Sequence, residues 1–150
     1  MKFARECLNN VRHEMQRLLD AHWREVELNQ DKIPLQPDWE QYSKLDAINV
    51  LHIYTARSNG ILVGYVVFFV SPAIHHKEFL FAVGDVIYLE PRHRAGLNGI
   101  KLLQYAEQEL KETGVSLISL NSKVDTPIDS LLKRALFTNT ERVYTKYIGD

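Results

Sequence analysis

Apolar residues recur along this chain with two different periods, and each period predicts a different kind of element. Between residues 11 and 26 they fall every three or four positions, which predicts an amphipathic helix capped by Asn9 or Asn10. The apolar face of this helix is formed by Val11, Met15, Leu18, Leu19, His22 and Val26. A polar segment broken by prolines follows, and within it we expect a short helix near residues 39–45.

Strand patterns dominate the middle of the chain. Residues 2–7 favour a short opening strand with Phe3 and Cys7 inward. Two long apolar segments, VLHIYTARS and ILVGYVVFFV, flank Asn59-Gly60, a pair that favours a two-residue hairpin turn. The next segment, EFLFAVGDVIYLEP, predicts a third long strand that ends at Pro91.

After this strand the chain alternates between helix and strand. The pattern predicts a helix at 98–112, a strand at 115–120, a helix at 127–137 and a strand at 141–148. Gly114 ends the first of these helices, and Thr126 and Pro127 are suited to the start of the second. An antiparallel meander followed by strand-helix-strand implies an α/β fold with a mixed sheet and helices on its faces. No linker or repeat divides residues 1–150, so we expect a single domain.

Composition narrows the function classes. Hydrophobic residues make up 45% of the chain and charged residues 25%, as in a soluble globular protein. The formal net charge of −1 provides no general attraction for nucleic acid or an anionic membrane. The single cysteine fits a reducing compartment, and we expect a cytoplasmic protein without a membrane span.

The stretch PRHRAGLNGIKLL, from residue 91, is the strongest chemical signal. Helix N-termini carry free N–H groups and partial positive charge, which attract phosphate. Gly96 and Gly99 would allow an anion to approach the backbone, and Arg92 and Arg94 add charge. The alternative is a surface turn with solvated charges, and the loop alone favours neither interpretation.

The segment YLEPRHRAGLNGIKLL resembles the acetyl-CoA loop of the GNAT superfamily of N-acetyltransferases. Arg94 takes the Arg position of the family motif and Gly99 its last glycine, whereas Leu97 stands where the first glycine is expected. The resemblance extends over nearly the whole chain, including the closing LFTNTERVYTKYI. The stretches AHWREVELNQ, PDWEQY and SPAIHH resemble more narrowly small GNAT proteins encoded by tailed phages, which would place the protein in a host cytoplasm.

The resemblance implies a GNAT acyltransferase fold that binds acetyl-CoA. Pantetheine would pair with the exposed edge of the third long strand, at Ile87, Tyr88 and Leu89, and the Leu89 N–H would hold the oxyanion. The pyrophosphate would lie on the N–H groups of Arg94, Ala95, Gly96, Leu97, Asn98, Gly99 and Ile100. Asn121 matches a further position that often contacts the cofactor.

Asp85 is the candidate general base. It lies four residues before Leu89, so simple alternation places both side chains on one face of the strand. A carboxylate at the matching position is the base in one branch of the superfamily. The alternative is a structural aspartate bonded to backbone or to a tyrosine at a bend of the sheet.

Histidines offer further candidates. His76 is a candidate catalytic residue, because it could relay a proton, and His75 a candidate substrate ligand, although as neighbours they face opposite sides of a strand. His22 and Glu25 lie where the family builds its acceptor side, with a buried core histidine as the alternative for His22. The tyrosine that often protonates the departing thiolate is replaced by Leu132, so that water, His76 or Tyr144 would have to serve.

We therefore expect an acetyl-CoA-dependent N-acetyltransferase that acts by direct transfer and without a metal. Its acceptor would be an amine of a small molecule, or a protein lysine or N-terminus, and a homodimer is compatible with the sequence. The alternative is a GNAT-fold module that binds CoA or a partner protein without chemistry, which the residues at 97 and 132 favour.

Overall fold

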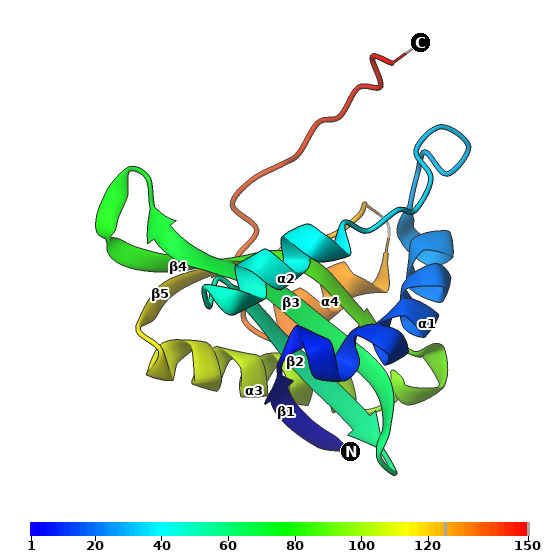
Figure 1. Ribbon diagram of the computed structural model, residues 1–150, viewed down its shortest axis with the longest axis horizontal. Coiled ribbons are helices and arrows are strands. Elements are labelled where there is room, and N and C mark those ends of the chain that lie inside the picture. The colour runs from blue at the N-terminus through cyan, green and yellow to red at the C-terminus, as the bar shows by residue number, and fades with distance from the viewer. Residues whose placement is uncertain (125, 150) are drawn as a thin grey trace.

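The computed structural model describes residues 1–124 and 126–149, which form one mixed sheet with helices on both faces (Figure 1). The sheet has five strands in the order β1-β2-β3-β4-β5. In chain order the elements are β1 (Lys2–Glu6), α1 (Leu8–Val26), α2 (Trp39–Ala47), β2 (Leu51–Ser58), β3 (Ile61–Ala73), β4 (His76–Leu89), α3 (Asn98–Glu112), β5 (Val115–Ser119) and α4 (Pro127–Arg134). The predicted α/β class with a meander and a strand-helix-strand crossover is confirmed.

The first four strands are antiparallel, and only β5 runs parallel to its neighbour β4. Asn59 and Gly60 make the turn between β2 and β3 with φ angles of 50° and 82°, as a two-residue hairpin of this type requires. The crossover helix α3 spans the predicted residues 98–112, and Gly114 follows it with a φ of 89°.

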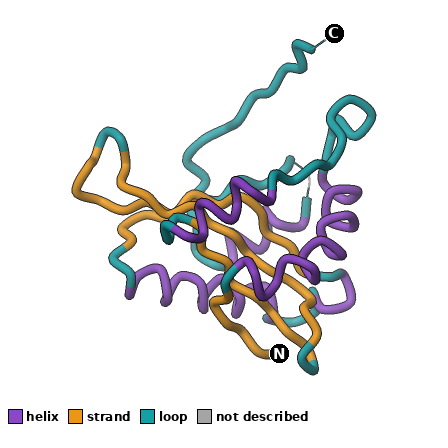
Figure 2. The backbone as a smooth tube through the Cα atoms, viewed as in Figure 1, coloured by secondary structure: helices purple, strands orange, loops and turns teal. Residues whose placement is uncertain are grey.

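Each face of the sheet carries its own apolar core. Helices α1 and α2 cover one face, where buried residues of α1 pack on β2, β3 and β4 (Figures 1 and 2). Helices α3 and α4 cover the other face, where Leu102, Leu103 and Leu110 of α3 are fully buried. The long strands are therefore apolar on both sides over their central residues, which explains the continuous hydrophobic run of β3.

The start of α1 differs from the sequence prediction. The helix begins at Leu8 with Cys7 at the cap position, so neither Asn9 nor Asn10 caps it. Cys7 is exposed rather than inward. The Leu8 N–H donates to the Asp46 carboxylate of α2 at 3.1 Å, so a residue distant in sequence supplies the cap.

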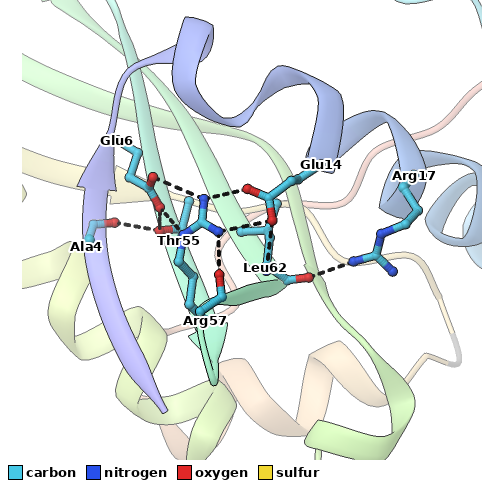
Figure 3. A network of polar contacts seen from close by, with 8 residues as sticks. Ala4, Glu6, Glu14, Arg17, Thr55, Arg57 and Leu62 are labelled. Atoms are coloured by element: carbon cyan, nitrogen blue, oxygen red, sulfur yellow. Dashed lines mark hydrogen bonds and ion pairs between the residues drawn. The ribbon is translucent and has the colours of Figure 1, made fainter.

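A polar network joins β1, β2 and β3 to α1 (Figure 3). The Arg57 guanidinium on β2 pairs with Glu6 of β1 and Glu14 of α1, both at 2.8 Å. Glu14 also accepts from the Leu62 N–H of β3 at 3.1 Å. The hydrogen bonds from Arg57 hold the pKa of Glu6 and Glu14 below the ordinary value, so this network stabilises the fold at neutral pH.

The C-terminal segment does not form the predicted final strand. Helix α4 ends at Arg134, before the predicted residue 137, and Leu136 follows in a left-handed conformation with φ 65°. Phe137 packs against the core, but Val143, Tyr144 and Ile148 are 69%, 87% and 86% exposed. The segment runs away from the sheet (Figure 1), so within the described chain its alternating pattern finds no strand to pair with.

Candidate active site

A β-bulge in β4 decides where Asp85 points. Val67 of β3 pairs with Val86, but its neighbour Phe68 pairs with Gly84, so Asp85 is an extra residue in the ladder. Asp85 consequently joins Val86 on the side of α1 and α2, while Leu89 packs into the core under α3. The expectation that Asp85 and Leu89 share a face is wrong, because the bulge breaks the two-residue alternation between them.

Within the described residues, the Asp85 carboxylate has one hydrogen-bond partner. The Tyr42 hydroxyl of α2 donates to it at 2.5 Å. Burial among apolar side chains raises the pKa of Asp85, and the Tyr42 hydrogen bond partly offsets this effect. Solvent reaches the carboxylate through an open pocket, so Asp85 is both accessible and more basic than an ordinary aspartate. This combination suits proton transfer.

The pocket has a volume of about 270 Å³ and lies between α1, α2, the 33–37 loop and the sheet. Trp23 and Leu19 of α1 form one wall, and Trp39 and Tyr42 of α2 another. The Arg12 guanidinium lies 5.1 Å from the centre of the Trp39 ring, a cation–π contact that holds the indole in place.

Beyond the bulge, one edge of β4 pairs with no strand among the described residues. Pairing with β5 stops at Val83, where Leu120 lies over Gly84 closely enough to exclude a Cβ there. The Glu90 N–H bonds the Val63 carbonyl at 2.8 Å on the β3 side. Because strand backbone groups alternate in direction, the N–H groups of Ile87 and Leu89 point the other way, into the gap.

The loop after β4 connects this strand to the start of α3. Gly96 adopts a left-handed conformation with a φ of 72°. The family motif expects its first glycine one position later, at Leu97. The Asn98 amide braces the loop by donating to the His93 carbonyl at 3.0 Å. No side chain caps α3, which leaves its first N–H groups free to bind an anion.

Gly99 has a packing role. A Cβ at this position would lie 3.1 Å from the Leu131 side chain of α4. The absence of a side chain therefore lets α3 and α4 approach closely. This helix contact explains a glycine at position 99, in addition to the space that Gly99 would leave for a phosphate.

The Arg94 side chain is held by protein groups. It forms a bidentate pair with Glu25 of α1 at 2.6 and 2.7 Å, and its Nε donates to the Leu89 carbonyl at 2.7 Å. The guanidinium also lies 5.4 Å from the centre of the Tyr88 ring. Glu25 and Arg94 thus fix the loop against α1. The Arg94 N–H donates to the Pro91 carbonyl at 3.2 Å, so protein groups engage both the side chain and the N–H of Arg94, and the role predicted for Arg94 in cofactor binding is not supported.

His22 is a buried histidine beside these residues. It is 8% exposed, stacks on Tyr88 with ring centres 4.9 Å apart, and lies 3.3 Å from the Tyr65 hydroxyl. Burial lowers the pKa of His22 to about 4, so the imidazole is neutral at physiological pH. This packing matches the core alternative considered for His22. Neither His22 nor Glu25 lines the pocket, whereas their neighbours Trp23 and Glu27 do.

Other predicted site residues lie elsewhere. His75 and His76 are exposed at the tip of the β3–β4 hairpin, and His76 precedes Asp85 by nine strand residues, about 30 Å. Within one chain, neither His75 nor His76 therefore reaches Asp85 to relay a proton or to bind substrate there. Asn121 is exposed just after β5, and Tyr144 lies in the projecting C-terminal segment. Leu132 is buried in the core, so the usual acid position holds no polar group.

Sequence reasoning missed the residues that shape the pocket. Trp23 lies on the last turn of α1 and Glu27 caps the end of that helix, four positions later. Trp39 and Tyr42 are three positions apart on α2, a spacing that places them on one helix face. The aromatic residues at helical spacing, with an acidic residue beside them, were the available signal. Among the described residues no cluster of three histidine, cysteine or acidic side chains could hold a metal ion. None of the described helices is both long and apolar enough to cross a membrane.

No protein-family model matches the sequence, and neither does any curated protein. Solved structures do match. An aminoglycoside acetyltransferase from an uncultured soil metagenomic sample superposes with a TM-score of 0.78 and 22% identity, covering 99% of this chain and 95% of that one. A ribosomal-protein-alanine N-acetyltransferase from Brucella melitensis biovar Abortus gives the same TM-score and identity over 99% and 98%.

A predicted acetyltransferase from Clostridium acetobutylicum, solved with acetyl-CoA, has a TM-score of 0.66 and 15% identity over 97% and 95% of the two chains. At these identities the likeness defines the fold. The free edge of β4, the loop and the uncapped α3 lie in the order that the sequence resemblance implied. The chain therefore has the GNAT N-acetyltransferase fold.

Proposed function

We propose that this protein is an acetyl-CoA-dependent N-acetyltransferase that transfers the acetyl group directly to an amine. The observation that carries the proposal is the continuity of the β4 edge with the start of α3. The N–H groups of Ile87 and Leu89 that face the gap would bind the pantetheine arm and its thioester, and the uncapped helix would hold the pyrophosphate. Acetyl-CoA complexes among proteins of this fold support this assignment.

In the proposed reaction the amine nitrogen attacks the thioester carbonyl carbon. Asp85 accepts the proton that the ammonium loses, directly or through a water in the pocket, and the Leu89 N–H donates to the oxyanion. The C–S bond then breaks and the CoA thiolate takes a proton from solvent. With Leu132 buried and Tyr144 projecting away, no side-chain acid is assigned. A thiol is acidic enough for its thiolate to leave without one.

The second candidate is a module that binds CoA but performs no chemistry. The buried Leu132 favours it, because the position of the usual acid carries no hydroxyl. The two candidates share cofactor binding and differ in turnover. Titration calorimetry with acetyl-CoA and a thiol-release assay with amines therefore separate them.

Leu97→Asp tests the cofactor site without weakening the fold. Leu97 is 53% exposed and precedes the first turn of α3, where a carboxylate interacts favourably with the helix dipole. The same negative charge would oppose a pyrophosphate, so we expect the thermal shift with acetyl-CoA to disappear. Leu97→Asn is the matched neutral control and should keep most of the shift. Equal acetyl-CoA binding by Leu97→Asp and the wild type would remove the assignment of this site.

A further inference from the structure

The pocket beside Asp85 restricts which amines can reach the proposed site. Its volume of about 270 Å³ is at or below the roughly 300–1,000 Å³ of pockets that enclose drug-sized ligands. Most of its lining is apolar, with Trp23, Trp39, Ile33, Leu35, Val67 and Val86 among the contributors. A bound molecule would therefore be small and would place carbon atoms against most of this surface.

Few polar groups of the pocket remain free to recognise a ligand. Its charged lining residues are Asp85 and Glu27, both acidic. Glu27 Oε1 already accepts from the N–H groups of Leu28 and Asn29, at 2.9 and 3.3 Å. Asp85 accepts from Tyr42 alone among the described residues. Asp85 thus has spare acceptor capacity for an ammonium group at the sheet wall, and the second oxygen of Glu27 and the Gln36 amide are the further polar groups of the lining.

A polycationic, polyhydroxylated acceptor fits this surface poorly. Each ammonium or hydroxyl group placed against the indoles and aliphatic side chains would lose its water without gaining a partner. A single ammonium beside Asp85 loses less, because the carboxylate can compensate it. An apolar body attached to that ammonium would gain from burial against the remaining walls.

We propose that the acceptor is a small primary amine whose ammonium group lies beside Asp85 and whose body is apolar, either aliphatic or aromatic. This inference rests on the proposed function, since it assigns the substrate class of the same site. It excludes aminoglycosides as preferred acceptors, although an aminoglycoside acetyltransferase shares the fold.

A homologous series of n-alkylamines from ethylamine to hexylamine tests the proposal, because these amines differ only in apolar length. We expect KM in the thiol-release assay to fall about fourfold for each added methylene until the pocket is full. Ethanolamine and sisomicin serve as polar monoamine and polycationic comparisons and should react poorly. Calorimetric binding of hexylamine to the CoA-bound protein provides a readout independent of turnover.

Ile33→Ser removes an apolar wall on a loop, where the side chain is already half exposed and contributes little to folding. It should raise KM for hexylamine several-fold and leave KM for ethylamine unchanged. Ile74→Ser, at the hairpin tip, is the matched control and should change neither value.

The outcomes separate the two proposals. If acetyl-CoA binds but KM is independent of chain length, or sisomicin or a peptide N-terminus is preferred, the acceptor class is wrong and the transferase proposal stands. If hexylamine does not bind at millimolar concentration, the acceptor class is also wrong. If hexylamine binds with the expected length dependence but acetyl-CoA does not, the transferase proposal fails instead.

Discussion

Tyr42 and Asp85, 43 positions apart in sequence, are joined by a 2.5 Å hydrogen bond that ties α2 to the bulge in β4. The bond holds the Asp85 side chain toward the pocket and restrains the rise in its pKa that burial causes. Burial and the neighbouring carboxylate raise the pKa of Tyr42 in turn, so the tyrosine remains a neutral donor. Both residues can be tested by isosteric substitutions.

Asp85→Asn should abolish most acetyl transfer without destabilising the protein. Asparagine can still accept from Tyr42 and removes a charge whose burial is unfavourable, so the melting temperature should stay equal or rise at neutral pH. Acetyl-CoA affinity should be nearly unchanged, because the carboxylate lies in the pocket beside α1 and α2 and not at the start of α3, where the pyrophosphate would bind. Thermal melts, calorimetry and the transfer assay give the three readouts. A variant with full turnover on its acceptor would exclude Asp85 as the base.

Tyr42→Phe should move the pH dependence of the reaction to higher pH. The hydroxyl stabilises the ionised carboxylate, so its loss raises the pKa of Asp85, and the base is ionised only at higher pH. The rate should be measured with an acceptor whose pKa is known, because deprotonation of the amine also makes the rate rise with pH. Tyr105→Phe, a tyrosine on α3 across the sheet, is the control. An unshifted profile would show that Tyr42 does not tune the base.

Arg94 and Glu25 should stabilise the free protein together. Their bidentate pair is partly exposed, with side-chain accessibilities of 34% and 37%, so its coupling in a double-mutant cycle should be at most about 1 kcal/mol. Arg94→Ala alone should cost more than Glu25→Ala, because it also removes the bond to the Leu89 carbonyl. Denaturant unfolding without cofactor measures both effects. Zero coupling at low salt would show that the pair does not form in solution.

His22 should make stability depend on pH. Its pKa is about 4 in the folded protein and about 6.5 in the unfolded chain, so the unfolded state binds the proton first. The stability is complete above pH 6.5 and is lost as pH falls toward 4, by up to about 3 kcal/mol. His22→Gln lacks this titration. The difference in free energy of unfolding between the wild type and His22→Gln should therefore become smaller toward acidic pH. A constant difference from pH 7 to pH 4.5 would contradict the assignment.

Removal of residues 139–150 should leave folding nearly unchanged. The apolar side chains of the described part of this segment are mostly exposed, so we expect the melting temperature to move by only about 2 °C. Phe137→Ala, which removes a ring packed on the core, should lower it clearly. A large fall in melting temperature on truncation would contradict this prediction. A fall in molecular mass from that of a dimer to that of a monomer, measured by light scattering, would show that the segment packs on a second copy. Homodimer formation remains a prediction until that measurement.

The sequence by itself determined the elements that local interactions specify. The Asn59-Gly60 turn is encoded by two residues that tolerate positive φ, and α3 is bounded by the loop before Asn98 and by Gly114. The apolar pattern of α1 and of the long strands was also enough to predict helices on the faces of a sheet, because each apolar face must be covered.

Tertiary structure decided the features that depend on distant partners. The start of α1 is set by Asp46, which is 38 positions from Leu8. The face of Asp85 is set by the register between β3 and β4, because a bulge is a property of two strands together and leaves no mark in one strand's alternation. Residues 141–148 carry a strand pattern but pair with none of the strands in the described part of the chain, because strand formation also requires a free sheet edge within reach, which local sequence does not specify.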